Sequence, residues 1–467
     1  MSQTQTAIVH QSQPAAGLLV SHNDLTTSAD DASIDSSLLA FERALQLHAD
    51  GDYVSAVELY GDISPNSPAF HEGQHFLGIA LHHLGQYEQA VTLLRASVAA
   101  TGGRVDWANN LGNILNAQGR FDEAVEVFAR AIEYAPNQAL LWINLGATHE
   151  RLVHFEQAEH AYQTAIQLEP QSQEAYRLLS ALYERQQMQI EAVRTYCSGY
   201  IVAPRETTTP YLLGKAYYVL GRLDEAAEVY RQWKEAEPDN PIPAHLYAAC
   251  SRHDGGDTIP ERCSEDYVNV TFDEYADHFE GKLNQLDYRG PALLEQMMAQ
   301  RFKPDADMMV LDAGCGTGLC APVLRPYAAT MIGVDLSGSM LELARQRGLY
   351  ESLHKAEIGT FLTTVEKPYD LIACMDTLIY FGAIEQLFAR FAATISQNGW
   401  LIFTTEISLD NTKPYTLNPS GRYSHTVGYL HSVMETCGFD CLMFNHETLR
   451  TELQVPVRGV IVLAQRR

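Results

Sequence analysis

The sequence has little positive charge. Its 467 residues include 32 Lys and Arg against 58 Asp and Glu, which gives a formal net charge of −26 at pH 7. Nucleic-acid binding depends on neutralising phosphates with a basic surface, and no cluster of Lys or Arg in the sequence supplies one. We therefore expect no nucleic-acid partner.

Long apolar runs and paired cysteines are missing too. No segment approaches the ~20 apolar residues of a membrane-spanning helix, and the N-terminus lacks the basic start and apolar centre of a secretory signal. The eight cysteines include no CxxC pair, so neither a metal site nor a disulfide framework is predicted. These absences predict no membrane partner, no metal and a cytoplasmic location.

What the sequence does contain is enough apolar material for more than one core. Hydrophobic residues make up 46% of a chain of 467 residues, which is too long for one ordinary domain. Residues 1–36 are polar and end in a run of Ser, Thr and Asp. We expect them to form a disordered tail.

The residues that follow repeat with a period of 34. Each unit has a small residue in its first half, an alanine 12 positions later, a large residue four positions after that, and in five of the six units a proline near its end. The small residues are Ala44, Gly78, Gly112, Gly146, Ser180 and Gly214, the alanines are Ala56, Ala90, Ala124, Ala158, Ala192 and Ala226, the large residues are Tyr60, Leu94, Phe128, Tyr162, Tyr196 and Tyr230, and the prolines are Pro68, Pro136, Pro170, Pro204 and Pro238. Such a unit predicts two antiparallel helices that approach closely at the small residues.

This pattern resembles the tetratricopeptide repeat. Six repeats and a capping helix are predicted over residues 37–252. The resemblance implies an all-α superhelix whose concave face binds a protein or peptide. The alternative is a scaffold that supports a homodimer or braces a second domain.

After a predicted linker at 253–266, short apolar runs alternate with helical patterns. Strands are predicted at 308–314, 330–335, 369–376 and 400–407, with a final pair near the C-terminus, and helices at 319–327 and 337–348. Alternation of this kind indicates a mostly parallel sheet covered by helices. We assign residues 267–467 to this α/β domain.

A glycine-rich turn, "DAGCGTG", follows the first of these strands. A phosphate-binding loop would need a Lys after Gly318, and the dinucleotide fingerprint would need Gly in place of Leu319. What remains is three alternating glycines, Gly314, Gly316 and Gly318, and a second strand that ends in Asp335.

These residues resemble those of class I S-adenosylmethionine-dependent methyltransferases, and residues 37–467 resemble bacterial methyltransferases that carry N-terminal tetratricopeptide repeats. The resemblance implies a multidomain protein with a Rossmann-like α/β domain, a mostly parallel seven-stranded sheet, S-adenosyl-L-methionine as cofactor and S-adenosyl-L-homocysteine as product. Asp335 would hold the ribose hydroxyls, Glu357 or the backbone of Ile358 would meet the adenine, and Tyr275 would belong to a lid. The residues implied to bind the cofactor are Asp312, Gly314, Cys315, Gly316, Gly318, Asp335, Leu336, Met340, Glu357, Ile358, Asp376 and Tyr275.

Methyl transfer to a hydroxyl or a protonated amine also needs a base. Glu406 ends the predicted strand at 400–407, and His425 follows in a loop where a ring that titrates near neutral pH would be useful. Tyr380 offers an aromatic face that tolerates a sulfonium charge. We predict these three as catalytic residues, and Arg422 and Tyr423 as substrate contacts.

Three functions are compatible with the sequence. The first is a methyltransferase whose repeats recruit a protein, peptide or carrier-bound acceptor. The second is a methyltransferase that acts on a small metabolite or sugar, with the repeats as a dimerisation scaffold. The third is a non-catalytic adaptor that binds the cofactor.

Overall fold

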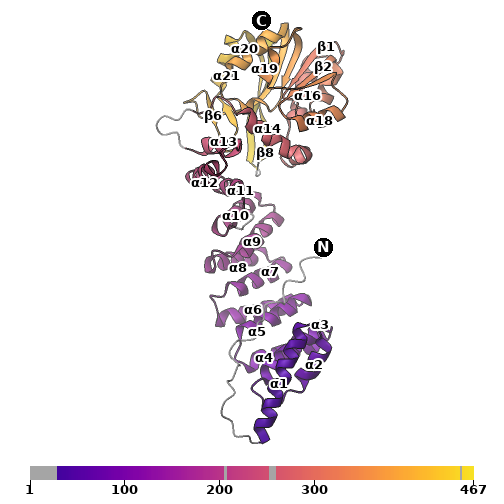
Figure 1. Ribbon diagram of the computed structural model, residues 1–467, viewed down its shortest axis with the longest axis vertical. Coiled ribbons are helices and arrows are strands. Elements are labelled where there is room, and N and C mark those ends of the chain that lie inside the picture. The colour runs from indigo at the N-terminus through magenta and orange to yellow at the C-terminus, as the bar shows by residue number, and fades with distance from the viewer. Residues whose placement is uncertain (1–28, 205–207, 252–258, 453–454) are drawn as a thin grey trace. The chain divides into compact units, whose positions relative to one another are not determined.

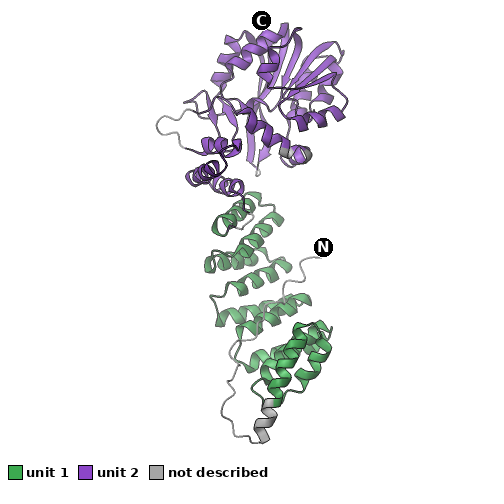
Figure 2. Cartoon of the chain, viewed as in Figure 1, with its two compact units in different colours: residues 1–203 green, residues 204–467 purple. Residues whose placement is uncertain are grey.

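The computed structural model describes residues 29–204, 208–251, 259–452 and 455–467 (Figure 1). The chain divides into two compact units, residues 1–203 and residues 204–467 (Figure 2). The second unit therefore starts within the predicted repeat array. Of the predicted tail, residues 1–28 lie outside the described residues, but the chain is helical from Ala29 onward, which differs from the expected disorder.

The first unit consists of paired helices, as the repeat pattern predicts. No helix in the described ranges is both long and apolar enough to cross a membrane. The helices are α1 (Ala29–Ala49), α2 (Tyr53–Gly61), α3 (Phe70–His83), α4 (Tyr87–Ala100), α5 (Val105–Ala117), α6 (Phe121–Tyr134), α7 (Ala139–Arg151), α8 (Phe155–Leu168), α9 (Gln173–Arg185) and α10 (Gln189–Val202).

The small residues of the repeats do allow close approach between paired helices. A Cβ atom added at Gly112 would lie 2.5 Å from Cζ of Phe128, and one added at Gly146 would lie 2.7 Å from a ring carbon of Tyr162. Helices α6 and α8 each end two residues before a proline, as expected from the steric restriction that proline imposes on the residue before it. In these two pairs a small residue of one helix therefore packs against a large side chain of the other.

One predicted large residue does not pack in this way. Tyr60, Leu94, Phe128 and Tyr162 are fully buried, whereas Tyr196 is 50% exposed. In that repeat the small residue is Ser180, whose hydroxyl donates a hydrogen bond of 2.8 Å to the carbonyl of Ala192. This hydrogen bond joins the two helices at the position where the other repeats bury a large side chain, and the Tyr196 ring lies outside that contact.

The second unit opens with the last helical pair and the capping helix, and these pack on the α/β domain. His245 in the capping helix approaches the carbonyl oxygen of Gly421 to 2.8 Å with Nε2, and its ring lies 4.0 Å from that of Tyr267. Of the predicted linker, residues 253–258 lie outside the described residues, and Arg262 forms an isolated bridge with Phe381. The helices here are α11 (Pro210–Val219), α12 (Leu223–Ala236), α13 (Pro241–Cys250), α14 (Glu265–Tyr275), the 3-10 helix η1 (Ala276–His278), α15 (Phe279–Gln285) and α16 (Gly290–Arg301).

The sheet confirms the predicted α/β class and adds two short strands to it. The described residues form a nine-stranded sheet in which β3-β2-β1-β4-β5 run parallel, while β9 pairs antiparallel with β5 and β8. The strands are β1 (Met308–Ala313), β2 (Ala328–Asp335), β3 (Ser352–Lys355), β4 (Tyr369–Cys374), β5 (Ile395–Ile407), β6 (Tyr415–Leu417), β7 (Tyr423–His425), β8 (Phe439–Glu452) and β9 (Val455–Arg466). The sequence predicted seven strands, because β6 and β7 have three residues each, too few to show an alternating pattern.

Alternate residues of the strands face two apolar layers. Leu311 of β1 lies in the layer formed with the helices α19 to α21, and Val310 lies in the layer formed with α16 and α17. The sheet is therefore covered on both faces, which places the carboxyl ends of its parallel strands along one open edge. These helices are α17 (Ala321–Leu324), α18 (Gly338–Gln346), α19 (Ile358–Leu362), α20 (Glu385–Thr394) and α21 (Val427–Thr436), with η2 (Arg325–Tyr327) and η3 (Leu378–Tyr380) between them.

Candidate functional site

The glycine-rich turn leaves β1 with three residues in the left-handed region. Gly314, Gly316 and Gly318 have φ of 77°, 53° and 78°, a conformation that side chains other than glycine rarely adopt. A Cβ at Gly314 would lie 2.2 Å from Oγ1 of Thr377, whereas a Cβ at Gly316 would meet nothing within 4 Å. Gly314 is needed for packing, and Gly316 presents bare backbone to open space.

Asp335 ties the end of β2 to this turn. Its Oδ2 accepts a hydrogen bond of 2.9 Å from the backbone N–H of Gly316, and its Oδ1 accepts one of 2.9 Å from that of Ser337. Burial raises the pKa of Asp335, and these backbone donors oppose the rise. The carboxylate is thus fixed beside the turn with lone pairs left for a ligand.

A cavity of about 290 Å³ lies at the ends of β1, β2 and β4. Among the residues predicted to bind a cofactor, those that line the cavity are Asp312, Gly314, Cys315, Gly316, Asp335, Leu336, Met340, Glu357, Ile358 and Asp376. Gly318 does not line it, since a Cβ there would face Arg347 and Tyr350. The side chain of Tyr275 lies outside the described residues.

Two lining side chains support a ligand rich in hydrogen-bonding groups. Oγ1 of Thr317 and Oγ1 of Thr271 are both buried without a hydrogen-bond partner, and both residues line the cavity. Buried hydroxyls are nearly always paired in folded proteins. With the Asp335 carboxylate and the apolar walls of Leu336 and Ile358, they fit S-adenosylmethionine, which has polar ends and a flat base.

Sequence reasoning did not select these two threonines. Thr317 stands between Gly316 and Gly318, so the motif itself could have pointed to it. Thr271 lies in α14, which is remote in sequence from the turn. No pattern marks it.

Two of the predicted acids already have protein partners. Oδ2 of Asp312 accepts a hydrogen bond of 2.7 Å from the hydroxyl of Tyr350, and burial raises the pKa of Asp312 to about 6. Glu357 caps α19 by accepting from the N–H of Thr360 at 2.6 Å, and it pairs with Arg262 at 3.4 Å. Both carboxyls line the cavity while also bracing its wall.

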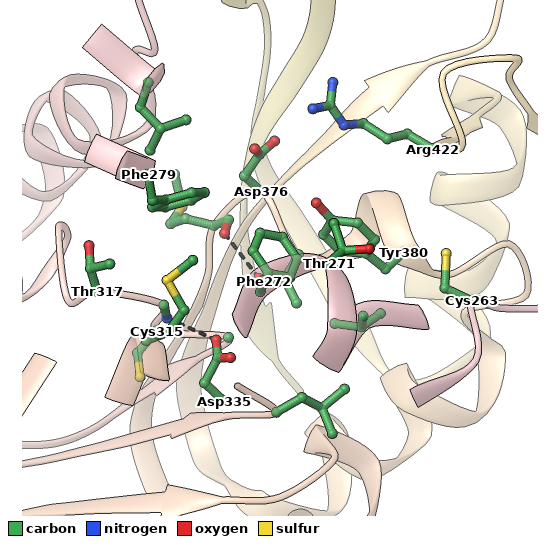
Figure 3. Close-up of a pocket in the computed structure, with 18 of the residues that line it drawn as sticks. Cys263, Thr271, Phe272, Phe279, Cys315, Thr317, Asp335, Asp376, Tyr380 and Arg422 are labelled. Atoms are coloured by element: carbon green, nitrogen blue, oxygen red, sulfur yellow. Dashed lines mark hydrogen bonds between the residues drawn. The ribbon is translucent and has the colours of Figure 1, made fainter. Parts of the chain in front are cut away.

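The other end of the cavity holds a network of charged side chains centred on Arg450. Arg450, 2% exposed, pairs with Asp376 at 3.3 Å, with Glu452 at 2.7 Å and also with Glu406. Glu452 in turn pairs with Arg422. Asp376, Arg422 and Arg450 line the cavity. In Figure 3, Asp376 and Arg422 lie toward one end of the cavity and Asp335 toward the other.

The backbone of Asp376 is strained. Its φ is 53°, which is uncommon for a residue with a side chain, and its N–H donates to the hydroxyl of Thr404 at 2.7 Å. Such strain is concentrated at functional sites. Here it turns the carboxylate toward the cavity.

The sequence analysis did not select Arg450, which lines the cavity, or its partner Glu452. They stand two positions apart on β8 and so share one face of the strand. The only sequence feature that could have pointed to Arg450 and Glu452 is the motif "LRTE". It lies in a strand whose burial is mixed. The motif is a weak signal, because charged pairs are common on exposed strands.

His425 is not at the site, which corrects our prediction of a catalytic base. It is 0% exposed and does not line the cavity. Its Nδ1 lies 2.8 Å from the hydroxyl of Thr405, and its Nε2 lies 3.1 Å from the carbonyl oxygen of Gly382. Burial lowers its pKa to about 4. The neutral ring thus links β7 to β5 and to the loop that follows η3.

Two more predicted residues lie behind the cavity wall. Glu406 is 8% exposed and bound to Arg450, so it acts on the site only through that guanidinium. Tyr423 is fully buried, and its hydroxyl donates to the carbonyl of Pro260 at 2.7 Å. Burial explains both corrections, since a strand that ends at the site still turns alternate side chains into the core.

Tyr380 does line the cavity, within an aromatic group. The ring of Phe272 lies 5.5 Å from that of Tyr380 and 5.8 Å from that of Phe279, with edge-to-face geometry in both pairs. Phe272 and Phe279 also line the cavity, and Figure 3 shows the three rings together. They form an apolar collar between the two polar ends.

Comparisons with known proteins agree with this arrangement. A family model described as a methyltransferase domain matches residues 285–442. Models of tetratricopeptide repeats match residues 71–96, 112–153, 139–172 and 210–241.

The curated relatives match over part of their length. The ubiquinone biosynthesis O-methyltransferase of Coxiella burnetii strain RSA 493 is 30% identical over 131 residues, 27% of this chain and 54% of that protein. The enzyme of the same name from Bordetella avium strain 197N is 32% identical over 101 residues, 21% of this chain and 42% of that protein. This chain thus spans about half the length of the curated relatives it matches.

The solved structures that are similar to this chain include a MamA protein and a methyltransferase. MamA from Desulfovibrio magneticus RS-1 covers 36% of this chain and 95% of its own, at 20% identity and a TM-score of 0.33. An S-adenosylmethionine-dependent methyltransferase from Mesorhizobium loti covers 37% of this chain and 96% of its own, at 21% identity and a TM-score of 0.30. On the family-model matches, this chain joins tetratricopeptide repeats to a methyltransferase domain.

Proposed function

We propose that this chain is an S-adenosylmethionine-dependent methyltransferase whose cofactor lies against the glycine-rich turn. The observation that carries the proposal is the Asp335 carboxylate, which both Gly316 and Ser337 hold at the cavity wall. A fixed acid beside bare backbone suits a ribose with two hydroxyls. The methyl-donor end would then point toward Asp376 and the aromatic collar.

The bound cofactor supplies a methyl group already activated on a sulfonium. Asp335 would accept hydrogen bonds from the ribose, and Leu336 and Ile358 would cover the base. Phe272, Phe279 and Tyr380 exclude water from the reacting atoms and tolerate positive charge at their ring faces. The chain's contribution is therefore to position the reacting groups and to exclude water from them.

Removal of a proton from the acceptor falls to Asp376 in this arrangement. His425 has both ring nitrogens engaged in the core, and Glu406 does not line the cavity. Asp376 lines the cavity, and Arg450 touches its Oδ1 at 3.3 Å. That pairing holds the carboxylate in place at the cavity wall.

The repeats would recruit a protein or peptide acceptor along their concave face. Support comes from helix α11 of the last repeat, whose Tyr211 lines the cavity. Recognition by repeats and chemistry in the cavity would then meet at one place. A homodimer built on the repeats is compatible with this function.

A small-molecule acceptor is the second candidate. It is favoured by the curated relatives, whose names describe O-methylation in ubiquinone biosynthesis.

Labelled methyl transfer separates the candidates. The purified chain is incubated with S-adenosylmethionine carrying a labelled methyl group and with a lysate split by size into protein and small-molecule fractions. Label in protein supports recruitment by the repeats, and label in small molecules supports the second candidate. Cofactor binding with no label in either fraction would contradict the enzyme and favour an adaptor.

A further inference from the structure

A helical segment ahead of the sheet forms one wall of the cavity. Helices α14, η1 and α15 follow one another over residues 265–285, and we call these residues the covering segment. Phe272 of α14 and Phe279 and Leu283 of α15 line the cavity. Two of the three rings of the aromatic collar therefore stand on the covering segment, and its position decides whether the cavity is closed on this side.

The C-terminal end of α18 holds one end of the covering segment. Nη2 of Arg347, the residue directly after α18, donates a hydrogen bond of 2.5 Å to Oε1 of Glu280 in α15. Its Nε donates one of 2.6 Å to the carbonyl oxygen of Thr317 in the glycine-rich turn. Thr317 lines the cavity, and Glu280 directly follows Phe279. One guanidinium thus joins the covering segment to the turn.

Gly318 leaves room for this connection. Its φ is 78°, and a Cβ there would lie 3.1 Å from Cδ of Arg347. That distance is shorter than an ordinary contact between carbon atoms, so a side chain at this position would press on the stem of the arginine. Because Gly318 does not line the cavity, the contact with Arg347 gives the third glycine of the turn a role of its own.

The N-terminal end of α18 holds α14. Oδ1 of Asp273 accepts hydrogen bonds from the hydroxyl of Ser337 at 2.5 Å and from the N–H of Ser339 at 3.3 Å. Ser337 caps α18, and its own N–H donates to Asp335. Asp335 is the acid proposed to hold the ribose. The second contact therefore also ends beside a residue of the cofactor wall.

We propose that α18 clamps the covering segment at both ends, and that Arg347 and Asp273 are positioning residues that slow the release of bound cofactor. The inference rests on the proposed function, because the retained ligand is S-adenosylmethionine or its product. The side chains of Arg347 and Glu280 are 27% and 45% exposed, so their ion pair is weak enough to break and re-form. A ligand on the turn and on Asp335 fixes both anchor points, so ligand binding and closure stabilise each other.

Hydrogen exchange of the full chain tests the clamp without a ligand. Backbone amides of the covering segment exchange when it opens locally. Glu280→Gln and Asp273→Ala should each speed this exchange roughly two- to fivefold. Arg345→Met is the control and should change nothing there, because exposed Arg345 pairs with Glu342 within α18. Unchanged exchange of the covering segment in both test variants would overturn the proposal.

Release of S-adenosylhomocysteine tests the effect of the clamp on the cofactor. Surface plasmon resonance measures its dissociation from the full chain. Arg347→Met removes both guanidinium contacts and should speed dissociation about three- to tenfold, and Arg347→Lys, which keeps the charge beside Glu280, should restore part of the loss. A variant that is merely less stable would lower the fraction of chain able to bind, but not the dissociation rate.

The outcomes separate the clamp from the proposed function. Dissociation from Arg347→Met as slow as from the unmodified chain would overturn the role of Arg347. Failure of the unmodified chain to bind S-adenosylhomocysteine would contradict the proposed function instead, and the hydrogen-exchange result would then decide whether α18 clamps the covering segment.

Discussion

Arg450 Nη1 lies 3.3 Å from Asp376 Oδ1, although 74 residues separate the two in sequence. The pair joins the end of β4 to the final hairpin and fixes a strained carboxylate at the cavity. Because Arg450 also binds Glu406 and Glu452, one guanidinium contacts three carboxylates. The position of these carboxylates at the cavity end away from Asp335 depends on this single side chain.

Loss of the Arg450 charge should destabilise the domain. Arg450→Met leaves buried carboxylates without a partner, and we expect the free energy of unfolding to fall by about 3–5 kcal/mol. Urea denaturation followed by circular dichroism measures it. The control is Arg345→Met, which removes an exposed pair with Glu342 and should cost less than about 1 kcal/mol. Equal effects of the two variants would show that the network adds nothing.

Gly314 and Gly316 should respond differently to the same change. Both have positive φ, so an alanine at either position costs about 1–2 kcal/mol of strain. Gly314→Ala also drives a Cβ into Thr377 and should lower stability further. Gly316→Ala should lose no more stability than this strain, but it should lose affinity for S-adenosylhomocysteine, because its Cβ enters the cavity. Thermal unfolding and calorimetry give the two readouts, and unchanged affinity in Gly316→Ala would place the cofactor elsewhere.

Asp312 should make stability depend on pH. Its pKa is raised from 3.8 to about 6, so the folded state holds a proton that the unfolded state releases. The stability due to this proton is fully present below about pH 4 and is lost as the pH rises through about 6, a difference of about 3 kcal/mol. Asp312→Asn should remove this decline, since an amide can still accept from the Tyr350 hydroxyl. The measurement is the free energy of unfolding of both proteins at pH 4.5 and pH 7. The same change with pH in both proteins would contradict the raised pKa of Asp312.

The repeats should be sensitive to volume at one contact. Gly112→Ala places a Cβ against the Phe128 ring and should cost about 1–3 kcal/mol. Phe128→Leu alone creates a cavity, but the double variant should be more stable than the sum of the single effects predicts. A double-mutant cycle by chemical denaturation measures this coupling. Strict additivity would mean that the two positions do not touch.

Deletions should reveal where the catalytic unit begins. Removal of residues 1–203 leaves the second compact unit whole, so the remaining chain should fold and bind S-adenosylhomocysteine. Removal of residues 1–252 also deletes His245, which contacts Gly421 and Tyr267, and should give an unstable protein. Circular dichroism and calorimetry of the two truncated chains make the comparison. Full stability of the shorter chain would show that the last repeat is dispensable.

The strongest periodic signals in the sequence predicted the structure well. The 34-residue repeat gave the helical pairs, and "DAGCGTG" followed by a strand ending in Asp335 gave the turn and its acid. These features are local, because each depends on residues close together in the chain. A backbone with positive φ requires glycine, and a close contact requires a small residue opposite a large one. Both requirements can be recognised in the sequence.

The acceptor end could not be predicted in the same way. Arg450 and Asp376 meet only because β8 returns to the sheet, and His425 turned inward because β7 pairs with β5. Whether a residue at a strand end faces the cavity or the core depends on tertiary packing. Sequence reasoning selected the correct strand ends but not the direction of the side chains.

The most direct measurement of the central claim is calorimetric titration of S-adenosylmethionine and S-adenosylhomocysteine into the full chain, into Asp335→Ala and into Asp305→Ala. Asp305 is exposed and lies outside the cavity, so it serves as the matched control. The account predicts that the full chain and Asp305→Ala bind both ligands and that Asp335→Ala binds neither detectably. Undiminished binding by Asp335→Ala, or no binding by the full chain, would contradict it.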